Sequence, residues 1–135
     1  MLNLFPELLT YSLLAPFILR VVLGFTLINL GLLKLGTEKE NWQFLIENFV
    51  SKKFSSSIIK IVAVVEITGG FLLILGMYTQ VLALIFSALI LIHLLLDIKE
   101  ESLVKRNLVF YLLILAISIS LLFSGAGAFA VDLAI

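Results

Sequence analysis

The sequence has 135 residues, of which 62% are hydrophobic and 13% are charged, with nine basic and nine acidic side chains and no cysteine. Soluble domains average about 45–50% apolar and about 25% charged residues, so this composition predicts an integral membrane protein, and the length predicts one domain over residues 1–135. The balanced charge argues against a nucleic-acid partner, and the lack of cysteine excludes disulfides, thiolate metal sites and thiol redox chemistry.

Four apolar segments follow one another along the chain, at about residues 13–35, 58–77, 80–97 and 107–124. Each approaches or exceeds the roughly 18–20 residues that a helix needs to cross a bilayer. Inside a membrane the backbone must satisfy its own hydrogen bonds, so each segment is predicted to be a helix. We therefore expect an all-α fold, an integral membrane four-helix bundle in contact with the lipid bilayer.

The connection between the first two segments carries its own helical pattern at about residues 38–53. Apolar side chains recur there at spacings of three and four, at Trp42, Leu45, Ile46, Phe49 and Val50. That spacing places them on one face of an amphipathic helix. We expect this helix to lie in the membrane interface with Trp42 at headgroup level. The alternative is a cap packed on the bundle.

Basic residues cluster on one side of the predicted bundle. They lie in or beside the two long loops, at Lys34, Lys39, Lys52, Lys53, Lys60, Lys99, Lys105 and Arg106. The positive-inside rule then places the long loops in the cytoplasm and both termini outside. The tyrosines Tyr11, Tyr78 and Tyr111 are expected near the membrane boundaries, as members of aromatic belts.

Several polar residues interrupt the apolar segments, at Arg20, Asn29, Lys34, Glu66, Thr68, His93, Asp97, Tyr111, Ser118 and Ser120. A charged side chain at mid-membrane costs about 2.5–3.5 kcal/mol on insertion scales, so such groups face the bundle interior and pair. At 1.5 Å per residue, Arg20 lies roughly 10 Å and Glu66 roughly 15 Å below the outer surface. The sequence therefore predicts that Glu66 faces Arg20.

His93 and Asp97 are four residues apart, on one face of the third predicted span, so Asp97 could orient His93. We take Glu66, His93 and Asp97 as a candidate proton relay, and Arg20, Glu66 and His93 as candidate binding residues. Each has a structural alternative. Arg20 and Glu66 would form an ion pair that only fixes helix register, His93 would be hydrogen-bonded within the bundle, and Asp97 would only end its helix. A single histidine and no cysteine predict no metal site.

Three stretches resemble the DoxX family of small four-helix membrane proteins. They are "LLAPFILRVVLGFTLINLGLLKL", "VVEITGGFLLILGMYTQVLAL" and "GAGAFAVDLAI", which follow one another in the family's order and cover most of the chain. The resemblance implies a prokaryotic cytoplasmic membrane protein. More loosely, it implies a subunit of a redox system for sulfur compounds or redox stress, with quinone as acceptor.

Three functions are compatible with these features. The first is a quinone-interacting membrane subunit with no intrinsic cofactor, which takes electrons from a redox-enzyme partner. The second is a non-enzymatic scaffold that recruits soluble partners through the cytoplasmic loops and the Trp42 helix. The third is a small-molecule transporter formed by a homo-oligomer, with the small-residue row of Ala116, Ser120 and Ser124 as contact.

The orientation predicts a labelling pattern. Because the chain has no cysteine, single cysteines can report which side each segment faces. Asn3→Cys should react with a membrane-impermeant maleimide added to intact cells, because the amino terminus is expected outside. Ser51→Cys should react only after the membrane is opened. The reverse pattern would contradict the orientation.

Overall fold

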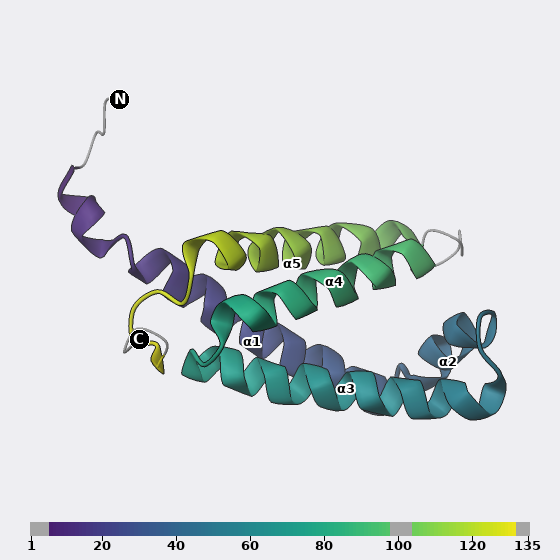
Figure 1. Ribbon diagram of the computed structural model, residues 1–135. Coiled ribbons are helices and arrows are strands. Elements are labelled where there is room, and N and C mark those ends of the chain that lie inside the picture. Colours follow the sequence, from purple (N-terminus) through teal and green to yellow (C-terminus); the bar gives the residue numbers. More distant parts are fainter. Residues whose placement is uncertain (1–5, 98–103, 132–135) are drawn as a thin grey trace.

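The computed structural model describes residues 6–97 and 104–131, and these residues form helices without any strand. A short 3₁₀ helix, η1 (Pro6–Tyr11), precedes five α-helices (Figure 1). The α-helices are α1 (Leu14–Leu35), α2 (Lys39–Glu47), α3 (Lys52–Leu75), α4 (Thr79–Asp97) and α5 (Val104–Ser124). The all-α class predicted from the sequence is confirmed for these residues.

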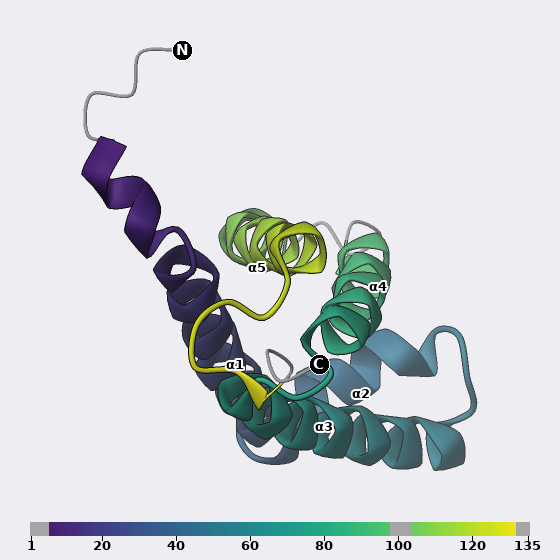
Figure 2. The ribbon, with the colours of Figure 1, turned by 60° about the vertical axis from the view of Figure 1, so that its left-hand side comes forward.

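The long helices form two pairs. The most extensive contact joins α1 to α3, and the next joins α4 to α5, while the contacts between the pairs are fewer. Figure 2 shows α4 and α5 together on one side and α1 with α3 on the other. The short helix α2 packs against α3 and α1. The site described below lies where α2 meets the two pairs.

Small residues bring the backbones of α1 and α3 into direct contact. A Cβ atom on Gly24 would lie 2.8 Å from the carbonyl oxygen of Gly70, and one on Gly31 would lie 2.8 Å from that of Ala63. The two contacts are one heptad apart on each helix and run in opposite directions, so the helices are antiparallel. Membrane helices commonly use small residues for such close approach.

The connection from α3 to α4 is a Schellman turn. Gly76 has a φ of 74°, its N–H donates to the Leu73 carbonyl at 3.0 Å, and the N–H of Met77 donates to the Leu72 carbonyl at 3.0 Å. A residue with a side chain rarely adopts this left-handed conformation, whereas glycine does so at little cost. The chain therefore reverses within Gly76, Met77 and Tyr78, and α4 begins at Thr79.

Two predicted helix boundaries differ in the structure. The helix expected over residues 38–53 ends at Glu47, and α3 begins at Lys52 instead of near residue 58. Extended backbone at Ser51, with φ −59° and ψ 148°, separates the two helices. The first turns of α3 are polar, so hydrophobicity alone could not assign them to a span. Trp42 and Leu45 are buried, and α2 packs against α1 and α3. This packing agrees with the cap given as the alternative, and a place for α2 in the membrane interface stays a prediction.

The surface of the described residues is largely apolar, and the hydrophobic interior also holds several charged and polar side chains. Large hydrophobic side chains point outward from every long helix, among them Phe25, Ile61, Leu84 and Leu113. Buried side chains include an arginine, a lysine, a glutamate and a histidine. Two helices, Leu14–Leu35 and Lys52–Leu75, are long and apolar enough to cross a membrane. The apolar parts of the other two, Thr79–Leu95 and Leu108–Ser124, are shorter.

The contact between α1 and α3 generates a stability prediction. Gly24→Ala should lower the free energy of unfolding by about 1–3 kcal/mol, the usual cost of overpacking a close contact, because the added methyl meets the Gly70 backbone. Val64→Ile adds one carbon at an exposed position of α3 and should change it by less than about 0.5 kcal/mol. Denaturation in detergent measures both, and equal effects would contradict the close contact.

Candidate functional site

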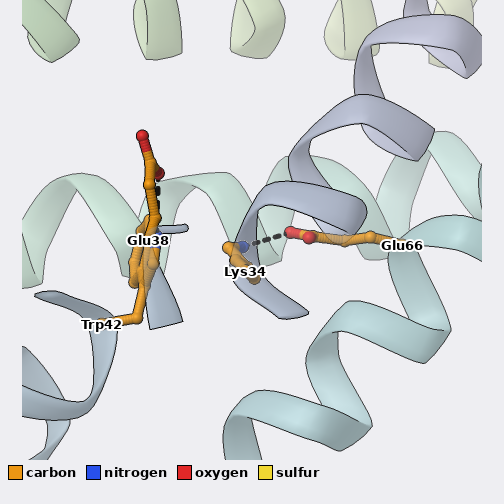
Figure 3. Close-up of polar contacts among 4 residues, drawn as sticks. All are labelled: Lys34, Glu38, Trp42 and Glu66. Carbon is orange, nitrogen blue, oxygen red and sulfur yellow. Dashed lines mark hydrogen bonds and ion pairs between the residues drawn. The ribbon is translucent and has the colours of Figure 1, made fainter. Parts of the chain in front are cut away.

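A buried ion pair joins the two most closely packed helices. The Nζ atom of Lys34, near the end of α1, lies 2.5 Å from Oε1 of Glu66, in the middle of α3 (Figure 3). The exposed fractions of the two side chains are 2% and 3%. Removing one member of such a pair leaves an uncompensated buried charge, so the two groups depend on each other.

The antiparallel register explains why Glu66 pairs with Lys34. Every Cα–Cβ bond of a helix tilts toward the amino terminus of that helix. In an antiparallel pair, the side chain of Lys34 therefore leans along α1 toward Glu66, and that of Glu66 leans along α3 toward Lys34. The two long side chains together span the distance along the helix axes that separates Lys34 from Glu66.

The predicted pairing of Glu66 with Arg20 is wrong. With Gly24 opposite Gly70, Arg20 stands level with Ile74, about 12 Å along the axis from Glu66 at 1.5 Å per residue. The two side chains also lean away from one another. Glu66 is therefore held by Lys34, which the sequence analysis placed among the polar residues of the first span and the basic residues of the cytoplasmic side, but not opposite Glu66.

Arg20 instead organises the segment that follows α5. Its guanidinium is fully buried. Nη1 donates to the carbonyl oxygen of Ala126 at 2.8 Å, and Nη2 lies 3.4 Å from the carbonyl oxygens of Ala128 and Phe129. The guanidinium carbon also lies 5.3 Å from the centroid of the Phe17 ring. Arg20 thereby ties the chain after α5 to the start of α1.

The backbone of that segment is shaped for this contact. Gly125, Gly127 and Phe129 have φ values of 77°, 75° and 54°. The N–H of Ala128 donates to the carbonyl oxygen of Leu13 at 2.9 Å. A Cβ atom on Gly127 would lie 2.8 Å from that same oxygen. Glycine at position 127 therefore satisfies both the left-handed φ and the close approach to α1.

The ring of Trp42 lies against Lys34, and two further rings pack on Trp42. Its Nζ lies 4.5 Å from the centroid of the Trp42 ring, a cation–π geometry. The His93 ring lies 4.8 Å from the Trp42 ring and 6.2 Å from the Tyr111 ring. The Trp42 indole N–H also lies 3.4 Å from Oε2 of Glu38, the residue before α2 (Figure 3). We call Lys34, Glu66, Trp42, His93 and Tyr111 the inner cluster.

A cavity of about 210 Å³ adjoins the inner cluster, between α2, α3 and α4. Lys34, Trp42 and His93 contribute to its wall, and most of the remaining wall is aliphatic, with Ile59, Val62 and Leu89 among its members. The cavity thus has an apolar body, with Lys34 and His93 among the residues of its wall. Such a combination suits a ligand with an apolar ring and a few polar atoms.

The candidate relay is brought together only in part. Glu66 and His93 both adjoin Lys34 or the cavity that it lines. Asp97 is the last residue of α4, and its side chain lies outside the described residues, so its role stays a prediction. Glu66 Oε2 is buried and has no hydrogen-bond partner within the described part of the chain. This oxygen is therefore available to a proton or a donor.

Lys34, Trp42 and Tyr111 were not among the site residues proposed from the sequence. Tyr111 is buried in the inner cluster, whereas it was expected at a membrane boundary. A signal for Lys34 was present, since it shares a helical stripe with Gly24 and Gly31, the residues that contact α3. No group of three or more histidine, aspartate and glutamate side chains is placed to hold a metal within residues 6–97 and 104–131.

Comparison with known proteins supports the resemblance noted from the sequence. A family model described as DoxX matches residues 15–96, which is more than half of the chain. These residues contain α2, α3 and all but one end residue of α1 and of α4, with Lys34, Trp42, Glu66 and His93. No curated protein and no solved structure matches the chain.

The ion pair generates a double-mutant prediction. Lys34→Met and Glu66→Gln should each destabilise the protein, with the lysine replacement costing about 3–5 kcal/mol because it leaves the carboxylate buried and unpaired. The double variant should lose less than the sum of the two, since neither charge is then stranded. Unfolding in detergent measures these free energies.

Lys60→Met provides the control, because Lys60 is an exposed lysine of α3 and its replacement should have an effect within about 0.5 kcal/mol. Strictly additive effects of Lys34→Met and Glu66→Gln would show that the two groups are not coupled.

Proposed function

The chain belongs to the DoxX family of small membrane proteins, and we propose that it is a multi-pass membrane protein that binds the head of a quinone beside Lys34. In this proposal it serves as the membrane subunit of a redox system in a prokaryotic cytoplasmic membrane. The four long helices cross the bilayer as a bundle, and α2 lies at the cytoplasmic end. Both termini face outward.

The distribution of side chains supports insertion into a bilayer. A soluble protein rarely exposes contiguous apolar patches larger than a few hundred Å². Here Ile18, Val64, Leu91 and Leu112 are exposed on four different helices, while the charged groups Arg20, Lys34 and Glu66 are buried. Lipid tails would cover the apolar surface without cost, and the bundle would shield the charges from the tails.

The observation that carries the ligand proposal is the apolar cavity with Lys34 and His93 on its wall. Its volume of about 210 Å³ is below the roughly 300–1,000 Å³ of pockets that enclose a whole drug-sized ligand. It therefore suits a ring whose tail continues into lipid. Ile92 lines the cavity and is also 51% exposed on the outside of α4, which gives such a tail an apolar exit.

The inner cluster supplies hydrogen bonds and a proton store. A bound quinone supplies the redox chemistry, taking up two electrons from a partner protein and two protons to become the quinol. The Lys34 ammonium has three N–H donors, of which one is bonded to Glu66, so another can donate to a quinone oxygen. Glu66 is an unprotonated carboxylate while it is paired with Lys34. After Lys34 has given a proton to the quinone, Glu66, with its unpartnered Oε2, can take up a proton from the aqueous phase and pass it to Lys34. His93 lies on the same wall and can serve the second oxygen.

A scaffold function is the second candidate, favoured by one feature of the surface. Phe44, Phe49 and Phe54 are exposed at the end of the molecule that carries α2. A soluble partner could dock on these rings, and the ion pair would then serve only the fold. The quinone function requires a cavity that can admit a ligand, whereas the scaffold function does not.

Cavity-filling variants test the quinone proposal. Val62→Phe puts a larger side chain into the cavity wall, whereas Val64→Phe makes the same change on the outward face of α3. Mass spectrometry of lipids that co-purify with each protein should find isoprenoid quinone in the wild type and in Val64→Phe. In Val62→Phe the quinone content should fall at least about tenfold, which corresponds to about 1.4 kcal/mol of binding free energy.

Glu66→Gln provides the second comparison, because it keeps the size of the side chain while removing its charge. Its quinone content should also fall. If all four proteins are folded and none carries quinone, the quinone proposal is contradicted and the scaffold function takes its place. Equal quinone content in all four would place any quinone outside the cavity.

A further inference from the structure

A regular stripe of exposed side chains runs along the outward face of α1. Its members are spaced by four, three, four and three residues, at Ile18, Val22, Phe25, Asn29 and Leu32. The four apolar members are between 48 and 64% exposed. Spacing that alternates between three and four is the heptad pattern of helices that pair along a seam. We call these five residues the α1 seam.

The α1 seam faces away from α3 and borders α5, whose Phe110 lines a groove together with seam residues. At 100° per residue it is centred roughly 120° around α1 from Gly24 and Gly31, the residues that contact α3. Nothing in the described part of the chain covers it, since all five side chains are exposed. A contact made there would leave the α1–α3 pair and the cavity unchanged.

Asn29 is the exception within this apolar stripe. Its amide is exposed beside a groove of about 440 Å³ that Phe25, Leu32 and, from α5, Phe110 also line. The outward hydroxyls of Thr26 and Thr68 donate to carbonyl oxygens of their own helices at 2.8 Å. The Asn29 amide makes no hydrogen bond within the described residues. It lies about 9 Å from the inner end of α1 at 1.5 Å per residue, where lipid offers it no partner.

We propose that the α1 seam is the interface of a parallel homodimer in which the Asn29 amides of two copies hydrogen-bond to each other. The inference rests on the membrane insertion proposed above but not on the quinone site. Two copies inserted in the same direction and related by an axis along the membrane normal place identical residues at identical depth. Asn29 of one copy therefore faces Asn29 of the other.

The chemistry of the amide favours a second copy over other occupants. A carboxamide carries both donors and an acceptor, so two of them can satisfy each other symmetrically. A single asparagine at one core position of a heptad seam is known to fix register and to favour dimers. A lipid chain offers no hydrogen bond, and an unrelated helix would need a polar group at this same depth. A second copy of the chain provides such a polar group by symmetry, because its own Asn29 lies at the same depth.

The natural absence of cysteine permits a crosslinking test in native membranes. Leu32→Cys places a thiol on the α1 seam, and Val64→Cys places one on the outward face of α3, close to the depth of Asn29. Oxidation with copper phenanthroline should join copies of Leu32→Cys into a covalent dimer. Val64→Cys should crosslink at least fivefold more slowly.

Asn29→Leu in the Leu32→Cys chain tests the role of the amide, and Asn29→Gln restores an amide. The leucine variant should lose at least fivefold in crosslinking rate, and the glutamine variant should recover part of that loss. Equal rates for Leu32→Cys and Val64→Cys, or an unchanged rate with Asn29→Leu, would overturn the dimer.

Resistance of each variant to carbonate extraction, and its quinone content, are measured on the same membranes. Extraction of the chain by carbonate would overturn insertion and the dimer together. Seam crosslinking without bound quinone would support the dimer while contradicting the quinone site.

Discussion

The positions of the buried charged groups depend on the backbone contact between α1 and α3. Glycine at positions 24, 31 and 70, with alanine at 63, lets the backbones of α1 and α3 come into direct contact. That closeness fixes an antiparallel register, and the register decides which charged groups can meet. Lys34 and Glu66 lean toward each other along the two axes, whereas Arg20 and Glu66 lean apart. The ion pair is therefore a consequence of the glycine contact.

Arg20 and Lys34, both buried, consequently have different tasks. Arg20 binds carbonyl oxygens of the segment after α5 and closes one end of the molecule. Lys34 lies toward the other end, between Glu66, the Trp42 ring and the cavity. A lysine held by a single carboxylate oxygen keeps donors for a ligand, whereas an arginine engaged by several carbonyls is committed to the fold. This difference is why the proposed quinone site is built on Lys34.

Sequence reasoning predicted the parts of the fold that follow from hydrophobicity and missed those that depend on register. The apolar segments and the position of Glu66 among buried residues could be read from residue types. The partner of Glu66 could not be predicted in this way. The depth estimate placed the outer ends of α1 and α3 at the same level, whereas the glycine contacts offset them by about four residues, or roughly 6 Å. Trp42 and Tyr111 were assigned to interfaces because aromatic residues are frequent there, and only the packing of α2 against the other helices reveals that they meet His93.

The most direct test of the Lys34–Glu66 pair is its distance in a lipid bilayer. Solid-state NMR on protein with ¹⁵N-labelled lysine and ¹³C-labelled glutamate reports the dipolar coupling between Lys34 Nζ and the Glu66 carboxyl carbon, assigned by its loss in Lys34→Arg. A strong coupling is expected in the free protein, together with a shift of the Nζ resonance when a short-tailed quinone is added. The absence of any such coupling in folded, membrane-inserted protein would contradict the pairing on which the proposed site is built.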